Sequence, residues 1–145
     1  PVDGEAPVRI IDDYGHHPVE IEAVLKAARA MLGQGQLIAV CQPHRYTRTR
    51  DLFEDFTQVL CEVDALVLLD IYSAGESPIA GADARTLTRA IRARGKVDPV
   101  FCENVDALGE VLEGVLRNGD VLLTLGAGNV GAVPALLSAR WEACR

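Results

Sequence analysis

One stretch near the start of the chain indicates how the rest is organised: Ile11-Asp12-Asp13-Tyr14-Gly15-His16-His17-Pro18. An apolar run ends there in two carboxylates, a glycine then lets the backbone turn, and a proline opens the next segment. This order is typical of a β-strand that leads through a loop into a helix, which is where α/β proteins place binding and catalytic residues. We therefore expect a functional site at this loop.

Composition narrows the class of protein. The 145 residues, 49% hydrophobic and 24% charged, fit one globular domain. A net charge of −7 argues against nucleic acid or an anionic membrane as the main partner, and no apolar run approaches the roughly 20 residues of a membrane helix. The four cysteines lack a CxxC spacing, so we expect buried free thiols in a reducing cytoplasm.

Apolar periodicity predicts a regular alternation of elements along the chain. Strands are expected at residues 8–12, 37–41, 65–71, 100–102 and 121–125. Helices are expected at residues 18–32, 47–63, 84–94 and 106–116, with a last one reaching about residue 141. This alternation predicts an α/β fold, a three-layer, doubly wound, Rossmann-like domain with a mostly parallel sheet of about six strands. Polar clusters at 12–17, 42–48 and 72–81 should then converge at the carboxyl ends of the strands.

The boundaries of the chain suggest a piece of a longer protein. It begins with Pro1, and its single methionine is Met31. We expect residues 1–7 to be a linker from preceding domains and residues 8–145 to form one domain.

The second polar cluster favours a site for an anion. Arg45 and Arg48 are three residues apart and would project from the same side of a helix. Two guanidinium groups beside a helix N-terminus would bind a carboxylate or a phosphate. The alternative is a solvated basic face paired with Asp51 or Glu54.

Three further features have competing interpretations. The histidines at 16, 17 and 44, with Asp12 and Asp13, could hold a metal, but adjacent histidines usually point apart, so we expect one imidazole to pack or hydrogen-bond locally and the other to face the crevice. Gly126 to Gly131 matches GxGxxG, which we interpret as a tight strand-to-helix turn because no further strand with an acidic residue follows. Glu76 is either part of a lid or binding segment or a solvated loop carboxylate.

Four motifs in order give the chain a resemblance to the C-terminal domain of the Mur ligases, from about Val8 onward. They are Asp12-Asp13-Tyr14-Gly15-His16-His17-Pro18, His44-Arg45-Tyr46-Thr47-Arg48-Thr49, Tyr72-Ser73-Ala74-Gly75-Glu76 with Pro78-Ile79, and Gly126-Ala127-Gly128. Within the family they are most similar to the members that join L-alanine to UDP-N-acetylmuramate in bacterial peptidoglycan synthesis. Members that attach a recycled tripeptide share much of the pattern, and Tyr14-Gly15 favours the alanine type.

The resemblance implies an ATP-dependent amide ligation in the bacterial cytoplasm. The carboxylate of UDP-N-acetylmuramate takes the γ-phosphoryl group of ATP, with Mg²⁺ neutralising phosphate charge, and the amine of L-alanine then displaces phosphate. The missing N-terminal and central domains would carry the Gly-Lys-Ser/Thr phosphate loop, whereas the Gly95-Lys96 of this chain is followed by Val97. This chain would be the amino-acid-binding lid domain, inactive alone, with ATP and Mg²⁺ held mainly by the other domains.

The resemblance also assigns roles to single residues. Arg45 and Arg48 would bind the carboxylate of alanine, and Tyr14 and His16 would border the amino-acid pocket and orient the substrate. Asp13 would lie near the ATP ribose when the domain closes. No residue is assigned as a catalytic group or a metal ligand.

Two functions of other classes stay open from the residues alone. The first is a non-catalytic nucleotide-binding module that uses the Gly126 turn. The second is a metal-dependent hydrolase that uses the three histidines.

Overall fold

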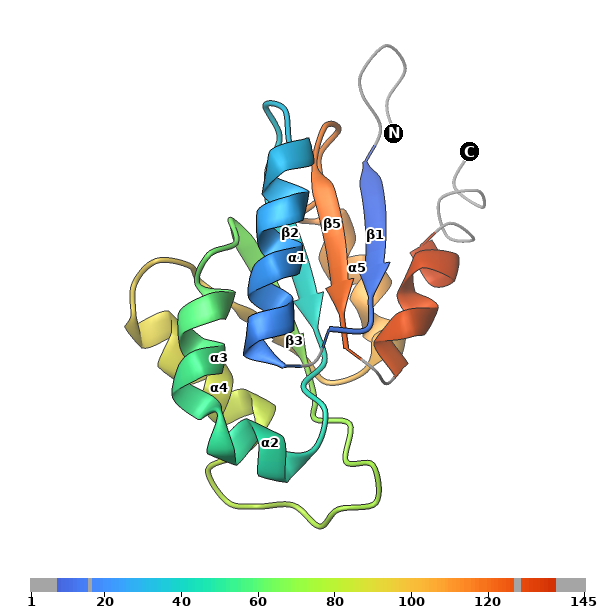
Figure 1. The fold of residues 1–145 in the computed structure, drawn as a ribbon. Helices are drawn as coiled ribbons and strands as arrows, with labels where there is room; N and C mark the ends of the chain where they lie inside the picture. The colour runs from blue at the N-terminus through green and yellow to red at the C-terminus, as the bar shows by residue number, and fades with distance from the viewer. Residues whose placement is uncertain (1–7, 16, 127–128, 138–145) are drawn as a thin grey trace.

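The structure is a computed structural model that describes residues 8–15, 17–126 and 129–137 (Figure 1). The expected linker at residues 1–7 lies outside the described residues. Among those described, no helix is long and apolar enough to cross a membrane.

A parallel sheet of five strands forms the centre of the described chain, in the order β1-β5-β2-β3-β4. The strands are β1 (Arg9–Asp13), β2 (Leu37–Cys41), β3 (Ala65–Leu69), β4 (Val100–Cys102) and β5 (Val121–Leu125). The α/β class with a mostly parallel sheet is confirmed, but the expected count of about six strands is wrong for the described residues. After β5 the described residues form a 3-10 turn, η2 (Asn129–Ala132), and a helical segment at 133–137, and neither adds a strand to the sheet.

Helices cover both faces of the sheet. They are α1 (Pro18–Met31), α2 (Tyr46–Asp51), α3 (Phe53–Leu60), α4 (Ala84–Ala93) and α5 (Leu108–Glu113), the last preceded by the 3-10 turn η1 (Val105–Ala107). Apolar residues of α1, α3 and α4 share one core cluster with the sheet, and those of α5 and residues 133–137 share another. The layers in Figure 1 follow this division, so the fold has three layers and is doubly wound.

The two central strands explain why the domain folds around them. Every residue of β2 and β5 is buried because each strand is covered on both faces. Successive side chains of β2 alternate between the clusters, Leu37 and Ala39 facing α1 and α3, and Ile38 facing α5. Fully burying one such leucine or isoleucine contributes about 1.5–3 kcal/mol.

One expected helix is divided in the structure. The pattern at residues 47–63 predicts a single helix, but α2 ends and α3 begins around Leu52, whose φ of −116° and ψ of 22° are not helical. Leu52 and Phe53 both pack against the core cluster under α1 and α3. Tertiary packing therefore overrides local helix propensity at a position that has no glycine or proline to signal a break.

Candidate functional site

The carboxyl ends of β1, β5 and β2 meet at the point where the segments that follow neighbouring strands pass to opposite faces of the sheet. The segments after β1 and β2 lead to helices on one face, whereas the segment after β5 leads to residues packed on the other face. Ligands of open α/β sheets bind at such a point. The backbones join there, since Gly126 N donates to Asp13 O at 3.2 Å and Gln42 N donates to Leu125 O at 2.9 Å.

Gly126 makes the turn after β5. Its φ is +140°, and a Cβ there would lie 2.7 Å from Gln42 O and 2.9 Å from Val130 Cγ1. The buried side chain of Gln42 closes the turn, because its Oε1 accepts from Val130 N at 3.0 Å. This geometry agrees with the interpretation of a tight strand-to-helix turn, although Ala127 and Gly128 lie outside the described residues.

The two carboxylates at the end of β1 make different hydrogen bonds. Asp13 Oδ1 accepts from Gly15 N at 2.7 Å, and a Cβ on Gly15 would lie 2.9 Å from that same oxygen. Asp12 Oδ1 accepts from the Thr124 hydroxyl at 2.6 Å, which ties β1 to β5. Asp13 therefore shapes the start of the loop, which presents the Tyr14 side chain at 75% exposure.

Of the two adjacent histidines, the structure describes His17. His17 precedes α1 and caps it, because its Nδ1 accepts from Val19 N at 3.2 Å. The expected local hydrogen bond of one imidazole is thus found at His17. His16, which is predicted to bind the substrate, lies outside the described residues. Among the residues that are described, no group of three histidine, cysteine, aspartate or glutamate side chains is placed to hold a metal ion.

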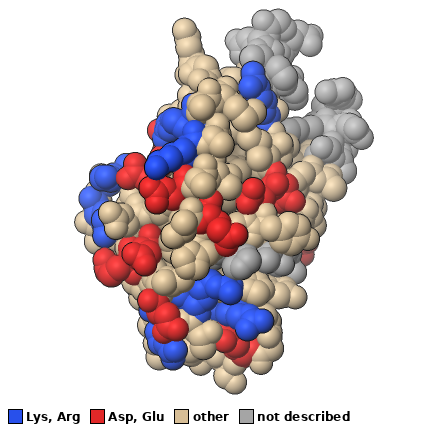
Figure 2. All heavy atoms as spheres, viewed as in Figure 1, with Lys and Arg blue, Asp and Glu red and all other residues tan. Residues whose placement is uncertain are grey.

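The two arginines of the second cluster are presented in different ways. Arg45 precedes α2, is exposed, and has a φ of 72°. Arg48 lies in α2 and is half-buried, with its Nη1 3.0 Å from His44 Nδ1 and donating to His44 O at 3.3 Å. The helical spacing argument therefore applies to Arg48 but not to Arg45. Figure 2 shows Lys and Arg atoms gathered on the lower part of this face, near α2, beside Asp and Glu atoms.

The third cluster is bound to the second by main-chain and side-chain contacts. Tyr72 N donates to Pro43 O at 2.9 Å, and Arg45 N donates to Tyr72 O at 2.8 Å. The rings of His44 and Tyr72 stack with centroids 5.6 Å apart and planes 14° from parallel. Of the three clusters expected to converge, the second and third are in direct contact, and the first adjoins the second through the Gly126 turn.

Glu76 occupies the position that an anion would take at the start of α2. Its Oε1 accepts from Thr47 N at 3.1 Å and its Oε2 accepts from Thr47 Oγ1 at 2.6 Å. These bonds, with a smaller contribution from the nearby Arg45, hold the pKa of the Glu76 carboxyl below its usual 4.5. From the sequence alone, Glu76 is either part of a lid or binding segment or a solvated loop carboxylate. A partner 29 residues away carries no local signal that could have revealed the contact.

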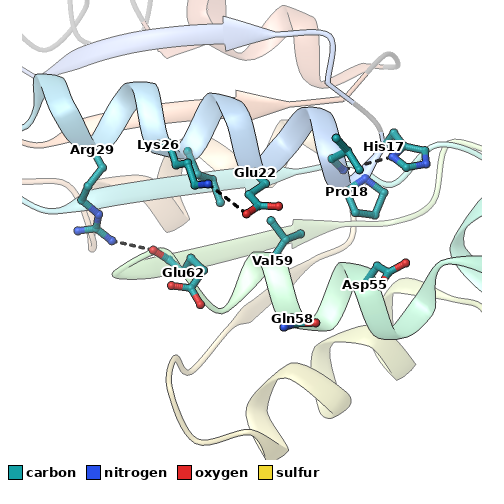
Figure 3. A pocket seen from close by; sticks show the side chains of 11 residues that line it. His17, Pro18, Glu22, Lys26, Arg29, Asp55, Gln58, Val59 and Glu62 are labelled. Atoms are coloured by element: carbon teal, nitrogen blue, oxygen red, sulfur yellow. Dashed lines mark hydrogen bonds and ion pairs between the residues drawn. The ribbon is translucent and has the colours of Figure 1, made fainter.

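A groove of about 510 Å³ lies elsewhere, between α1 and α3 (Figure 3). Leu25, Val59 and Pro18 contribute apolar atoms to its wall. Its two basic side chains are engaged, because Lys26 pairs with Glu22 at 3.4 Å and Arg29 Nη2 donates to the carbonyl of Glu62 at 2.7 Å. The groove contains neither Arg45 nor Arg48, so the carboxyl ends of the strands remain the candidate site.

The site and the fold together define a family. A family model described as the Mur ligase, glutamate ligase domain matches residues 1–128. The chain therefore belongs to the Mur ligase family, through this domain, and the family resemblance of the motifs is confirmed.

Individual relatives are similar over most of the chain. It is 56% identical over 137 residues to UDP-N-acetylmuramate–L-alanine ligase of Methylococcus capsulatus, and 59% identical over 128 residues to the protein of that name from Neisseria meningitidis serogroup A. These matches cover 94% and 88% of the chain, which spans 29% and 27% of those relatives. The UDP-N-acetylmuramate-alanine ligase structure from Thermotoga maritima matches with a TM-score of 0.73 at 22% identity, over 94% of this chain and 27% of that one, which supports the fold.

Proposed function

We propose that the chain is the C-terminal, amino-acid-binding domain of an ATP-dependent ligase that joins L-alanine to UDP-N-acetylmuramate in peptidoglycan synthesis. The observation that carries this proposal is the pair Arg45 and Arg48, placed at the carboxyl ends of the strands in a chain 56–59% identical to ligases of that name. The three buried free thiols among the described residues support a reducing compartment, and we assign the protein to the bacterial cytoplasm.

The reaction follows from the substrates. A carboxylate oxygen of UDP-N-acetylmuramate attacks the γ-phosphorus of ATP, the bond to the bridging oxygen breaks, and ADP leaves. The amine of L-alanine then attacks the acyl phosphate carbon and loses a proton, and inorganic phosphate leaves with the electrons of the C–O bond. We assign Mg²⁺, the phosphates of ATP and the sugar nucleotide mainly to the other domains of the same protein, because the Gly95-Lys96 of this chain is followed by Val97 and not by the Ser or Thr of a phosphate loop.

The residues of this domain then bind and orient the amino acid. Arg45 and Arg48 bind its carboxylate, because a guanidinium offers two parallel N–H donors that match two carboxylate oxygens. Tyr14, exposed beside the turn, and His16 direct the amine toward the acyl phosphate, which is a positioning effect rather than acid–base chemistry. Asp13, with one oxygen held by Gly15 N, accepts from the ATP ribose when the domain closes. Closure also excludes water from the acyl phosphate.

The test is phosphate release from ATP by the full-length protein with UDP-N-acetylmuramate. Three reactions are compared, with L-alanine, with L-alanyl-γ-D-glutamyl-diaminopimelate, and without an acceptor. Release that depends on L-alanine supports the proposal. Release that depends on the tripeptide instead would reassign the protein to cell-wall recycling while keeping the chemistry. No acceptor-dependent release would contradict ligation and would favour a nucleotide-binding role.

A further inference from the structure

Two segments of the described chain form one unit, which we call the arginine clamp: residues 44–48 after β2 and residues 72–76 after β3. The backbone of Tyr72 binds the chain on both sides of His44, at the start of the first segment, since its N–H donates to Pro43 O and its carbonyl accepts from Arg45 N. An isolated parallel bridge pairs His44 with Tyr72, and their rings stack. The second segment therefore fixes the first beyond the end of the sheet.

Backbone strain is concentrated in the same unit. In the described part of the chain, the non-glycine residues with positive φ are Arg45 at 72° and Ala74 at 52°. Each such residue costs on the order of 1–3 kcal/mol and persists because its surroundings determine it. One of the two carries a guanidinium of the proposed substrate site, and the other forms the turn that returns Glu76 to it. Strain placed in this way is typical of functional sites.

Glu76 closes the clamp. Its N–H donates to Ser73 O at 3.0 Å, which folds the turn, and its carboxylate binds both the N–H and the hydroxyl of Thr47. Thr47 is two residues from Arg45 and one from Arg48. The Glu76 carboxylate also accepts the hydrogen bond of the Thr47 backbone amide at the start of α2. That amide is therefore occupied, and a substrate carboxylate would bind the guanidinium groups instead.

The second arginine is held from the other side of the clamp. The guanidinium of Arg48 has no acceptor atom, so the 3.0 Å contact makes His44 Nδ1 the acceptor and places the ring proton on Nε2. The same ring stacks on Tyr72. The turn at residues 72–76 thus supports Arg45 through the backbone and Arg48 through the imidazole.

We propose that Glu76 is a positioning residue that, through Thr47, holds the arginine clamp in the geometry that binds the carboxylate of the incoming amino acid. This inference rests on the proposed function and deepens it. Glu76 acts through Thr47 and the arginines, and it does not touch the substrate. The clamp therefore determines the affinity for the amino acid, while ATP and the sugar nucleotide are bound elsewhere.

The test uses the full-length protein and three variants. Glu76→Ala removes both contacts, whereas Glu76→Gln keeps an oxygen for Thr47 N and offers an amide donor to Thr47 Oγ1. Glu110→Ala removes an exposed acid from α5 and is the control for lost charge away from the clamp. Steady-state kinetics give the KM for each of the three substrates. Hydrogen exchange of a peptide covering residues 44–50 reports on the clamp without needing activity.

We expect Glu76→Ala to raise the KM for L-alanine on the order of tenfold, with the KM for ATP and for UDP-N-acetylmuramate changing less than about twofold. Exchange at residues 44–50 should be faster by about tenfold, because an amide and its neighbours lose a charged partner. Glu76→Gln should restore both values, and Glu110→Ala should change neither. If Glu76→Ala does not fold, Thr47→Val provides the test, because it removes the hydroxyl donor and keeps the amide.

The outcomes separate this inference from the proposed function. An active wild-type protein whose L-alanine KM is unchanged by Glu76→Ala overturns the positioning role alone, whatever happens to hydrogen exchange. An equal rise in all three KM values also overturns it, because that is the result of a general structural role. A wild-type protein that releases no phosphate with L-alanine overturns the proposed function and this inference with it.

Discussion

Carboxylates bind backbone amides at both ends of the sheet, with opposite results. At the amino ends, the buried Asp120 accepts from Gln36 N at 2.9 Å and from Arg117 N at 2.8 Å, which closes the loops before β2 and β5. At the carboxyl ends, the half-exposed Glu76 accepts from Thr47 N and leaves an arginine exposed on a strained backbone. The same kind of contact completes the fold at one end and supports the proposed binding surface at the other.

The strongest way to sharpen this comparison is to disturb the closed end. A Cβ on Gly35 would overlap the carbonyl group of Gly119, and because a Cβ is fixed by its own backbone and the carbonyl is backbone, no side-chain rotation can separate them. We expect Gly35→Ala to destabilise the chain by at least about 3 kcal/mol, measured as a loss of free energy of unfolding in urea. Gly33→Ala is the matched control, because nothing lies within 4 Å of its added Cβ. Equal stability of the two variants would show that the amino-end loops are not closely packed.

The next largest effect should appear at the open end, in function. Arg45→Ala in the full-length protein removes one of the two proposed partners of the substrate carboxylate. We expect the KM for L-alanine to rise by about 10- to 100-fold, because a hydrogen bond to a charged group contributes about 1.5–3 kcal/mol. The unfolding midpoint should fall little, since Arg45 is exposed. An unchanged KM would remove Arg45 from the carboxylate site.

Arg45→Gly should separate strain from binding at the same position. Glycine adopts a positive φ without a steric penalty, so this variant should be more stable than Arg45→Ala by about 1 kcal/mol in urea unfolding. Its KM for L-alanine should be at least as high as that of Arg45→Ala. If glycine gives no gain in stability over alanine, the backbone at this position is not strained.

The smallest expected effect is in the pH dependence of stability. The pKa of Glu76 is lowered in the folded chain by Thr47, so its contribution is present above the ordinary value of 4.5 and is lost as the pH falls through the lower folded value. The unfolding midpoint of the wild type should therefore fall more steeply below pH 4.5 than that of Glu76→Gln. Asp83, whose pKa is also lowered, is shared by both proteins, and Glu103→Gln controls for net charge. Parallel curves for all three would contradict a Glu76 carboxylate bound by Thr47.

The parts of the fold that could be predicted are those that depend on residues close together in the sequence. The bounds of β2, β4 and β5 match the expected ranges because each is a short apolar run between turn residues. Pro18 opens α1 as expected, because its missing N–H and fixed φ suit the first turn. The division at Leu52 could not be predicted, since it depends on packing against residues distant in sequence.

The candidate site shows the same division between local and distant information. Arg45 and Arg48 could be singled out because their residue types and spacing are visible in the sequence. The strain at Arg45 could not, because arginine gives no sign of a positive φ, and the N–H of this residue donates to the carbonyl of Tyr72, in a distant part of the sequence. The sequence leaves the role of Glu76 open for a related reason, because its partner Thr47 lies in α2, in another part of the chain.

The position of β5 has a consequence for how the chain is made. In the described sheet β1 pairs with β5 alone, and Arg9 lies opposite Val121. At a synthesis rate of about 5–20 residues per second, β1 waits roughly 6 to 20 seconds on the ribosome before its partner is built. Until then the strand that separates β1 from β2 in the sheet is missing, and the Gly126 turn that joins Asp13 to Gln42 has not been made. The edge at which we propose that substrate binds is thus completed last, after the helices that cover β2 and β3 have been translated.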